Sequence, residues 1–333
     1  MNTNYQTYKN EFISQLRNTY NKNLAYINYW FNQNISYINS LGLSNIKKKY
    51  LINLITIQYN NKINYLINTL NKNIADIQKS SNNIITINGK KNALLIGINY
   101  IGTINKLNGC INDINDINTR IKSKGFTNIN ILTDNTPVKP TRDNILSAFK
   151  NLLVNSKSGD LLFFAYSGHG SYQNDNNGDE TTGYDQLICP IDLKMITDDE
   201  LKAIIQTNLK KNVTLFAMFD SCFSGSVLDL KYQYMDTLNY NNFSENDKQL
   251  ETQGNVFLIS GCSDYQTSDD SIINGKSNGA MTWSLLRCLN QQSNISWRNL
   301  VKNMRDLLKK SEYEQVPQFS SGKFENIDTP VFI

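Results

Sequence analysis

The pattern of apolar and polar residues changes near residue 92, and the two parts of the chain predict different structures. In residues 1–91 the apolar side chains recur at the spacing of an α-helix, which is typical of helices that pack along one face. The clearest stripe consists of Ile63, Leu66, Ile67, Leu70, Ile74 and Ile77, and a weaker one surrounds Ile13, Leu16, Tyr20 and Leu24. Residues 40–45 (SLGLSN) interrupt the pattern, and Ser44 or Asn45 suits the N-cap of a second helix. We therefore expect a helical hairpin.

Beyond residue 92, short apolar runs alternate with amphipathic stretches. The runs predict buried strands at 93–98, 129–132, 161–166, 213–219 and 256–260, with a further candidate strand at 330–333. The stretches predict helices near 109–124, 142–155, 198–209, 279–290 and 296–310. Strands that alternate with helices form βαβ units, so we expect an α/β domain over residues 92–333 with a mostly parallel sheet flanked by helices. The polar segment 231–254 is too long for an ordinary loop, which predicts either a functional lid or a disordered segment.

Charge is unevenly distributed along the 333 residues. Residues 1–91 hold 11 Lys and Arg against 2 acids, a net charge of +9, and the remaining 22 basic and 27 acidic residues give −5. A basic arm of this kind can bind nucleic acid or a membrane, but docking on its own acidic domain is the simpler interpretation. No window approaches 18 uninterrupted apolar residues, and five scattered cysteines without a CxxC pair favour a reducing compartment over disulfides or zinc. We expect a soluble cytoplasmic monomer with no nucleic-acid or membrane partner.

Two of the predicted strands end in residues that can do chemistry. The run 161–166 leads into His169, the single histidine of the chain, which is flanked by glycines. The run 213–219 leads into Cys222, 53 residues after His169. Ligands bind at the carboxyl ends of parallel strands, and an imidazole there can take the proton of a thiol. The sequence therefore predicts a cysteine–histidine dyad, and the alternative is a buried structural thiol beside a core imidazole.

With these motifs placed, residues 92–333 resemble a type I metacaspase, a calcium-linked relative of the caspases. The matching segments follow the order of that family and are ALLIGINY (93–100), GCINDIND (109–116), YSGHG (166–170), GYDQLICPIDL (183–193), ITDDEL (196–201), FDSCFSGSVLDL (219–230), SGCSDYQTSDD (260–270) and GAMTWSLL (279–286). Caspases also place their histidine about 50 residues before the cysteine, although their local cysteine signature is absent here. Residues 1–91 do not resemble the proline-rich prodomain common in the family.

The resemblance implies a caspase-like fold and a cysteine endopeptidase with Cys222 as nucleophile and His169 as base. The backbone N–H groups of Gly170 and Cys222 are candidate oxyanion donors, since glycine lets a substrate approach the backbone closely. The resemblance also implies a pocket for a basic residue before the scissile bond (P1), lined by Cys110, Asp113, Ser167 and Asp220. Converging carboxylates favour a guanidinium or ammonium partner, whereas Asp113 taken alone would be a first-turn acid favoured by the helix dipole. The sequence departs from the family at Phe223, where metacaspases usually carry a histidine.

Four acids occur where metacaspases place calcium ligands, namely Asp185, Asp198, Asp199 and Asp229. Their spacing does not form an EF-hand. Carboxylates on converging loops repel one another unless a hard cation joins them, and ligand sets made only of oxygen suit Ca²⁺. The resemblance therefore implies Ca²⁺ and no organic cofactor. Without the resemblance, an ordinary solvated acidic face is the preferred interpretation.

Together these features predict a calcium-activated cysteine endopeptidase acting on protein or peptide substrates with a basic P1 residue. The alternative function is a non-proteolytic scaffold or regulator that binds a partner through its helical arm. Candidate self-cleavage sites lie in boundary or flexible sequence and are Lys79, Lys90, Lys91, Lys231 and Lys248. A further hypothesis places residues 79–91 across the dyad as an inhibitory strap, which self-cleavage would release.

Overall fold

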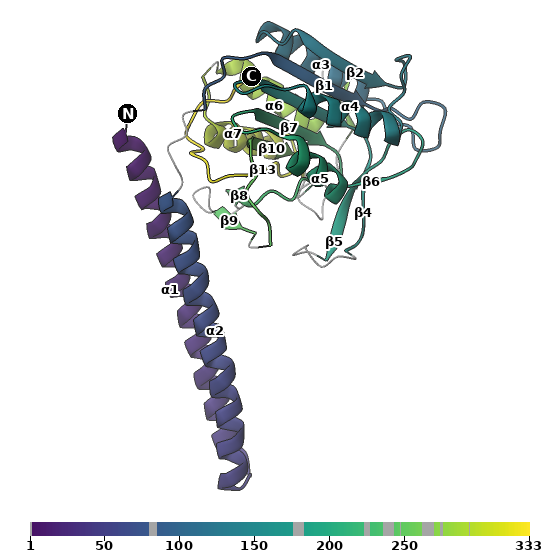
Figure 1. The fold of residues 1–333 in the computed structure, drawn as a ribbon. Helices are drawn as coiled ribbons and strands as arrows, with labels where there is room; N and C mark the ends of the chain where they lie inside the picture. Colours follow the sequence, from purple (N-terminus) through teal and green to yellow (C-terminus); the bar gives the residue numbers. More distant parts are fainter. Residues whose placement is uncertain are drawn as a thin grey trace. The chain divides into compact units, whose positions relative to one another are not determined.

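The computed structural model of the chain forms two compact units, Met1–Ile84 and Ile85–Ile333 (Figure 1). It describes residues 2–79, 85–175, 183–222, 227–235, 243–246, 248–261, 270–273, 276–292 and 294–333. Phe223, where the sequence departs from the metacaspase pattern, lies outside the described residues. The boundary between the units comes a few residues before the expected one at 91/92. The N–H groups of Asn88 and Gly89 already donate to the Gly159 carbonyl, which fixes this segment to the second unit.

The first unit is the expected helical hairpin. Helix α1 (Asn2–Ser40) and helix α2 (Asn45–Lys79) are joined by the short segment 41–44 and pack against each other. The rings of Phe31 and Tyr59 lie with their centroids 4.5 Å apart, and Lys9 Nζ donates to the Gln78 carbonyl at the open end. Among the described helices, none is long and apolar enough to cross a membrane.

The second unit is built on an eight-stranded sheet with the strand order β2-β1-β3-β7-β10-β13-β8-β9. Its strands are β1 (Lys91–Gly97), β2 (Asn128–Thr133), β3 (Leu161–Ser167), β7 (Thr214–Asp220), β8 (Tyr232–Tyr234), β9 (Phe243–Glu245), β10 (Asn255–Ser260) and β13 (Gln318–Ser321). The first five strands in the spatial order are parallel and the last three are antiparallel. Every residue of β3, β7 and β10 is buried, as expected for apolar runs in a sheet covered on both faces.

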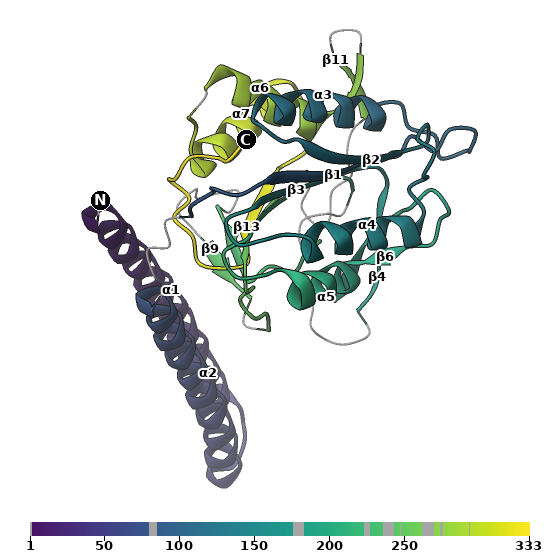
Figure 2. The same cartoon turned by 45° about the horizontal axis from the view of Figure 1, so that its top comes forward.

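Helices cover the two faces of this sheet, as the alternating pattern predicts. The helices are α3 (Cys110–Ser123), α4 (Arg142–Val154), α5 (Asp198–Asn208), α6 (Ala280–Gln291) and α7 (Trp297–Lys310). Figure 2 shows α3, α6 and α7 on one face and α4 and α5 on the other. The expected α/β fold with a mostly parallel sheet and an N-terminal helical extension is therefore confirmed.

Two small sheets accompany the main one, and the sequence pattern did not predict either. Strands β4 (Gly170–Asn174), β5 (Tyr184–Ile188) and β6 (Ile196–Thr197) form an antiparallel sheet directly after His169. Strands β11 (Asp270–Ile273) and β12 (Lys276–Gly279) form a hairpin before α6. These strands are short and several are polar, so their sequences lack the run or alternation that marks a buried strand.

Two local expectations are wrong. In segment 231–254 the described residues include β8 and β9, which extend the edge of the main sheet and bury Tyr232 and Tyr234. This part of the segment is therefore a sheet edge and not a lid, while 236–242 and 247 lie outside the described residues. The expected strand at 330–333 is reduced to a single bridge between Pro330 and Ser296.

Candidate active site

His169 and Cys222, the two candidate catalytic residues, follow adjacent strands of the main sheet. Strands β3 and β7 pair in parallel, and the last residue pair is Ser167 with Asp220. His169 and Cys222 each lie two residues beyond that pair, and neighbouring strands run about 4.8 Å apart. The loops also touch, because the Gly168 N–H donates to the Asp220 carbonyl at 3.3 Å. A Cβ atom at Gly170 would overlap the carbonyl oxygen of Cys222. The fold thus brings the imidazole and the thiol to one sheet edge.

The imidazole of His169 is oriented by a backbone group. Its Nε2 lies 2.7 Å from the carbonyl oxygen of Asn105, in the loop after β1. A carbonyl only accepts, so Nε2 carries the proton and Nδ1 holds the lone pair of the neutral ring. The ring also packs on Tyr100, with centroids 4.7 Å apart. The nitrogen able to act as a base is therefore Nδ1.

Two buried tyrosines hold the backbone of His169 in place. The His169 N–H donates to the Tyr100 hydroxyl at 2.9 Å, and the Tyr166 hydroxyl donates to the His169 carbonyl at 2.8 Å. Tyr100 also donates to the Cys189 carbonyl at 2.6 Å. Burial raises the pKa of both phenols, so they remain neutral donors. The sequence analysis did not identify this pair, because the apolar pattern places each tyrosine at the end of a predicted strand and says nothing about its hydroxyl group.

A second thiol lies near the candidate nucleophile. Cys189 follows β5 and is buried, whereas Cys222 is partly exposed. Burial, followed by the charge of Cys222, raises the pKa of Cys189 to about 11. Cys189 therefore remains a protonated thiol at neutral pH, and the thiol that a substrate can reach is Cys222.

The backbone N–H of Gly170, an expected oxyanion donor, lies on the unpaired side of its strand. Gly170 pairs with Ile188 across β4 and β5, and the flanking Cys189 N–H donates to the His169 carbonyl at 3.1 Å. In an antiparallel ladder this pattern makes Gly170 and Ile188 a non-hydrogen-bonded pair. The Gly170 N–H consequently points away from β5, on the open side of β4.

The four residues expected to line a P1 pocket are distributed around the same sheet edge. Asp113 and Cys110 lie in the first turn of α3, and Ser167 Oγ donates to the Asp113 carboxylate at 2.8 Å. Asp220 ends β7, beside Ser167. Burial, followed by the charge of Asp220, raises the pKa of Asp113 well above its ordinary value. Two buried carboxylates therefore lie close enough at this point to disfavour each other's charge.

The Asp113 carboxylate also accepts hydrogen bonds at the start of α6, a role that the sequence analysis did not predict. Its carboxylate accepts from the backbone N–H of Gly279 at 2.9 Å and from Asn278 Nδ2 at 3.0 Å, and Asp220 accepts from the Thr282 N–H at 2.9 Å. Both acids therefore bind N–H groups at the start of α6, which lacks a side-chain cap of its own. Asp113 does lie in the first turn of α3, as the alternative interpretation states, and its carboxylate also stabilises the start of α6.

The four acids expected to bind calcium lie around the start of α5. Asp198 is buried and accepts from the backbone N–H groups of Gln186 at 2.6 Å and of Asp199 at 2.9 Å. Burial, then the charges of Asp229 and Asp185, raise its pKa to about 8. Asp229 and Asp185 are thus each close enough to Asp198 to repel its charge. In the described part of the chain, however, no three His, Cys, Asp or Glu side chains are arranged to hold a metal ion.

The candidate self-cleavage lysines fall in different environments. Lys248 is exposed, whereas Lys231 is buried and forms an ion pair of 3.2 Å with Glu245. The Lys90 carbonyl accepts from the Leu161 N–H at the amino end of β3. His169 follows the other end, and the seven residues from Leu161 to Ser167 span about 20 Å. The strap hypothesis is therefore wrong for residues 88–91, and residues 80–84 lie outside the described residues.

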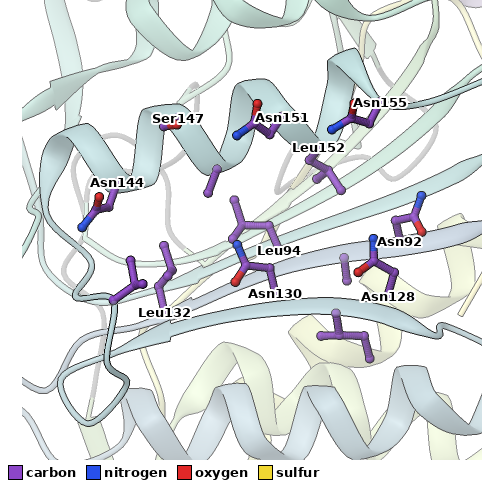
Figure 3. Close-up of a pocket in the computed structure, with 14 residues that line it drawn as sticks. Asn92, Leu94, Asn128, Asn130, Leu132, Asn144, Ser147, Asn151, Leu152 and Asn155 are labelled. Atoms are coloured by element: carbon purple, nitrogen blue, oxygen red, sulfur yellow. The ribbon is translucent and has the colours of Figure 1, made fainter.

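A cavity of about 540 Å³ lies elsewhere, between α4 and the strands β1 and β2 (Figure 3). Asparagine side chains from both layers line it, including Asn92, Asn130 and Asn151 (Figure 3). Its lining contains no thiol, imidazole or carboxylate. It therefore offers no nucleophile–base pair, and the chemistry belongs at the carboxyl ends of β3 and β7.

Comparison with known proteins agrees with this geometry. The family model described as "Metacaspase, peptidase C14 domain" matches residues 91–231. Metacaspase-1 of Lodderomyces elongisporus and of Candida albicans are each 36% identical to the chain, over 71% and 70% of it respectively. The chain spans 65% of the length of each of these two relatives. Metacaspase-1 of Scheffersomyces stipitis is 35% identical, over 70% of both chains. The crystal structure of a protein from Geobacter sulfurreducens superimposes with a TM-score of 0.56 at 26% identity, covering 73% of this chain and 98% of that one. The chain belongs to the metacaspase family of peptidase C14 proteins.

Proposed function

We propose that the chain is a cysteine endopeptidase that cleaves after Arg or Lys, is activated by calcium and processes itself. The observation that carries the proposal is the juxtaposition of His169 and Cys222 on paired strands, with His169 Nε2 fixed by the Asn105 carbonyl. A dyad whose base is pre-oriented by a third group is the usual arrangement for an activated nucleophile.

In this mechanism His169 Nδ1 takes the proton of the Cys222 thiol, and the thiolate attacks the scissile carbonyl carbon. The N–H groups of Gly170 and Cys222 donate to the oxyanion that forms. The protonated imidazole then gives its proton to the leaving amine, which leaves a thioester on Cys222. A water molecule loses a proton to Nδ1 and attacks the thioester carbonyl carbon. The carbon–sulfur bond then breaks, the carboxylic acid product is released, and the departing Cys222 thiolate takes the proton back from Nδ1.

The basic P1 specificity rests on Asp113 and Asp220. A guanidinium or ammonium group relieves the repulsion between two buried carboxylates, whereas a P1 aspartate would add a third negative charge. Asp220 ends β7 opposite Ser167, and the partly exposed Cys222 lies two residues beyond Asp220. The scissile bond and the acidic pair would therefore lie at the same edge of the sheet.

The chemistry of the four acids Asp185, Asp198, Asp199 and Asp229 suits calcium, because they supply only oxygen ligands and two of them repel the charge of Asp198. Bound calcium would neutralise this repulsion and order the loops that carry β5, α5 and Asp229. The arrangement has to shift to admit the ion, since the described residues do not form a ready-made metal site.

The test is hydrolysis of peptide amides ending in Arg, Lys or Asp by the full chain, with calcium or with a chelator, beside the Cys222→Ala variant. We expect calcium-stimulated hydrolysis of the Arg and Lys amides that Cys222→Ala abolishes. Activity in Cys222→Ala, or a preference for Asp, would contradict the proposal.

A second candidate function is a non-proteolytic scaffold or regulator. The hairpin favours it, because large apolar side chains on both helices are exposed, including Tyr26 at 69% and Ile46 at 84%. A binding protein has no need of a reactive thiol. Covalent labelling of Cys222 by a thiol-directed peptide ending in Arg would therefore favour the enzyme over the scaffold.

A further inference from the structure

A lysine extends into the acidic cluster of Asp185, Asp198, Asp199 and Asp229. Lys202 lies on α5, three residues after Asp199, and its Nζ is 3.6 Å from the Asp199 carboxylate and 3.5 Å from the Asp229 carboxylate. The Lys202 side chain is 14% exposed and that of Asp229 only 1%. The pair with Asp229 is therefore largely withdrawn from water, where an ion pair is much stronger than on an open surface.

Lys202 follows an acidic first turn of α5. That turn holds Asp198, Asp199 and Glu200, which suit the N-terminal end of a helix. Asp229 itself adopts a left-handed backbone conformation with φ of 45°, which is uncommon for a residue other than glycine. The Lys202 ammonium therefore joins the acidic first turn of α5 to the Asp229 carboxylate.

One lysine does not neutralise the cluster. Lys202 contacts Asp199 and Asp229, whereas the Asp198 carboxylate accepts from the backbone N–H groups of Gln186 and Asp199. A monovalent ammonium on two of the acids therefore leaves excess negative charge, which a divalent cation could remove. Calcium takes six to eight oxygen ligands, so it needs the carboxylate oxygens that Lys202 contacts.

We propose that Lys202 is a built-in counter-ion that competes with calcium for Asp199 and Asp229 and so sets the calcium concentration at which the cluster fills. The inference rests on the proposed calcium site. In the metal-free protein Lys202 stabilises the cluster, and when calcium binds, the flexible lysine stem carries the ammonium out toward solvent. The residue thereby raises the calcium threshold without being a ligand.

The test measures calcium binding by isothermal titration in the full chain carrying Cys222→Ala, which prevents self-cleavage. Lys202→Gln removes the competing charge, and Lys150→Gln, at an exposed position on α4, makes the same change of net charge elsewhere. We expect Lys202→Gln to lower the Kd for calcium by about ten-fold, within the usual range for two coupled ligands, and Lys150→Gln to leave it unchanged. Lys202→Gln should also lower Tm in chelator, and calcium should restore it.

The outcomes distinguish the competition by Lys202 from the calcium site itself. Equal Kd values in the parent protein and Lys202→Gln would overturn the competition and leave the calcium site standing. Calcium binding in neither protein would overturn the calcium site, and the competition with it. Lys202→Arg keeps the charge and the fold-stabilising contact, so it should bind calcium no more tightly than the parent. Tighter binding by Lys202→Arg would also contradict the proposal, even where Lys202→Gln fails to fold.

Discussion

The backbone of Gly170 packs against the carbonyl group of Cys222 so closely that a Cβ atom at position 170 would overlap the oxygen. The loop that carries the base and the loop that carries the nucleophile are therefore in direct contact. We expect Gly170→Ala to separate them and to lower kcat/KM by about 10²-fold, the usual cost of displacing a reacting group by about 1 Å. Steady-state kinetics with an Arg amide would measure this. Gly42→Ala, at a glycine with no neighbour within 4 Å, is the control and should retain full activity.

Tyr100 positions His169 through its hydroxyl, so Tyr100→Phe should affect both stability and rate. The variant leaves the His169 N–H without its acceptor in a buried place, which costs about 1–3 kcal/mol of unfolding free energy. We expect urea denaturation to show this loss and kcat to fall. Tyr172→Phe, at a ring that is 51% exposed, should change neither quantity. A Tyr100→Phe variant with unchanged kcat would show that the hydroxyl does not position the base.

The Asp220 carboxylate tests the basic P1 specificity with little risk to the fold. Only Oδ2 accepts the bonds from Thr282, so Asp220→Asn can keep its oxygen there while losing the charge. We expect kcat/KM for Arg and Lys amides to fall by about 10²-fold, mainly through KM. Asp143→Asn on the exposed face of α4 is the matched control. An unchanged preference for Arg in Asp220→Asn would remove Asp220 from the P1 pocket.

Asp198 should make the metal-free protein less stable as pH rises. Its pKa is raised from 3.8 to about 8, so the folded state binds this proton more tightly than the unfolded state. The corresponding stability is fully present below pH 4 and is lost as pH rises toward 8. Glu325, whose pKa burial also raises to about 8, acts in an overlapping window. Asp198→Asn should therefore reduce the fall of Tm between pH 5 and pH 8 in chelator without abolishing it. An identical slope in both proteins would contradict the raised pKa.

Exposure separates the candidate self-cleavage sites. Incubation with calcium should yield a fragment ending at Lys248, which is exposed, and none ending at Lys231, which is buried against Glu245. Mass spectrometry of the products, with Cys222→Ala as the inactive control, would measure this. Cleavage at Lys231 before Lys248 would mean that the edge strands β8 and β9 open first.

The sequence was most informative where a pattern was long. The runs ending at His169 and Cys222 predicted β3 and β7 within a residue or two, because fully buried strands need uninterrupted apolar side chains. The helices followed from amphipathic spacing, and the structure adds the caps Thr141 and Ser296 at the starts of α4 and α7. The short strands β4, β6 and β13 carry too few residues for a period to emerge.

Within the site, the sequence located side chains and missed backbone groups and contacts. Nothing in the residue type of Asn105 indicates that its carbonyl would face His169 Nε2, since every residue has a carbonyl. Likewise Lys202 reads as an ordinary helical lysine until Asp229, distant in sequence, is seen beside it. Such contacts depend on tertiary packing that no local pattern encodes.

The paired ends of β3 and β7 have a consequence for how activity can be lost. The backbone ladder from Leu161–Thr214 to Ser167–Asp220 does not depend on which side chains follow it. A single codon change at Cys222 would therefore remove the nucleophile and leave the sheet, the acidic pair at α6 and the oxyanion backbone of Gly170 intact. On the proposed function, such a protein would still hold a basic peptide without cutting it. A protease and a peptide-binding protein with this fold would then differ only in the thiol of residue 222.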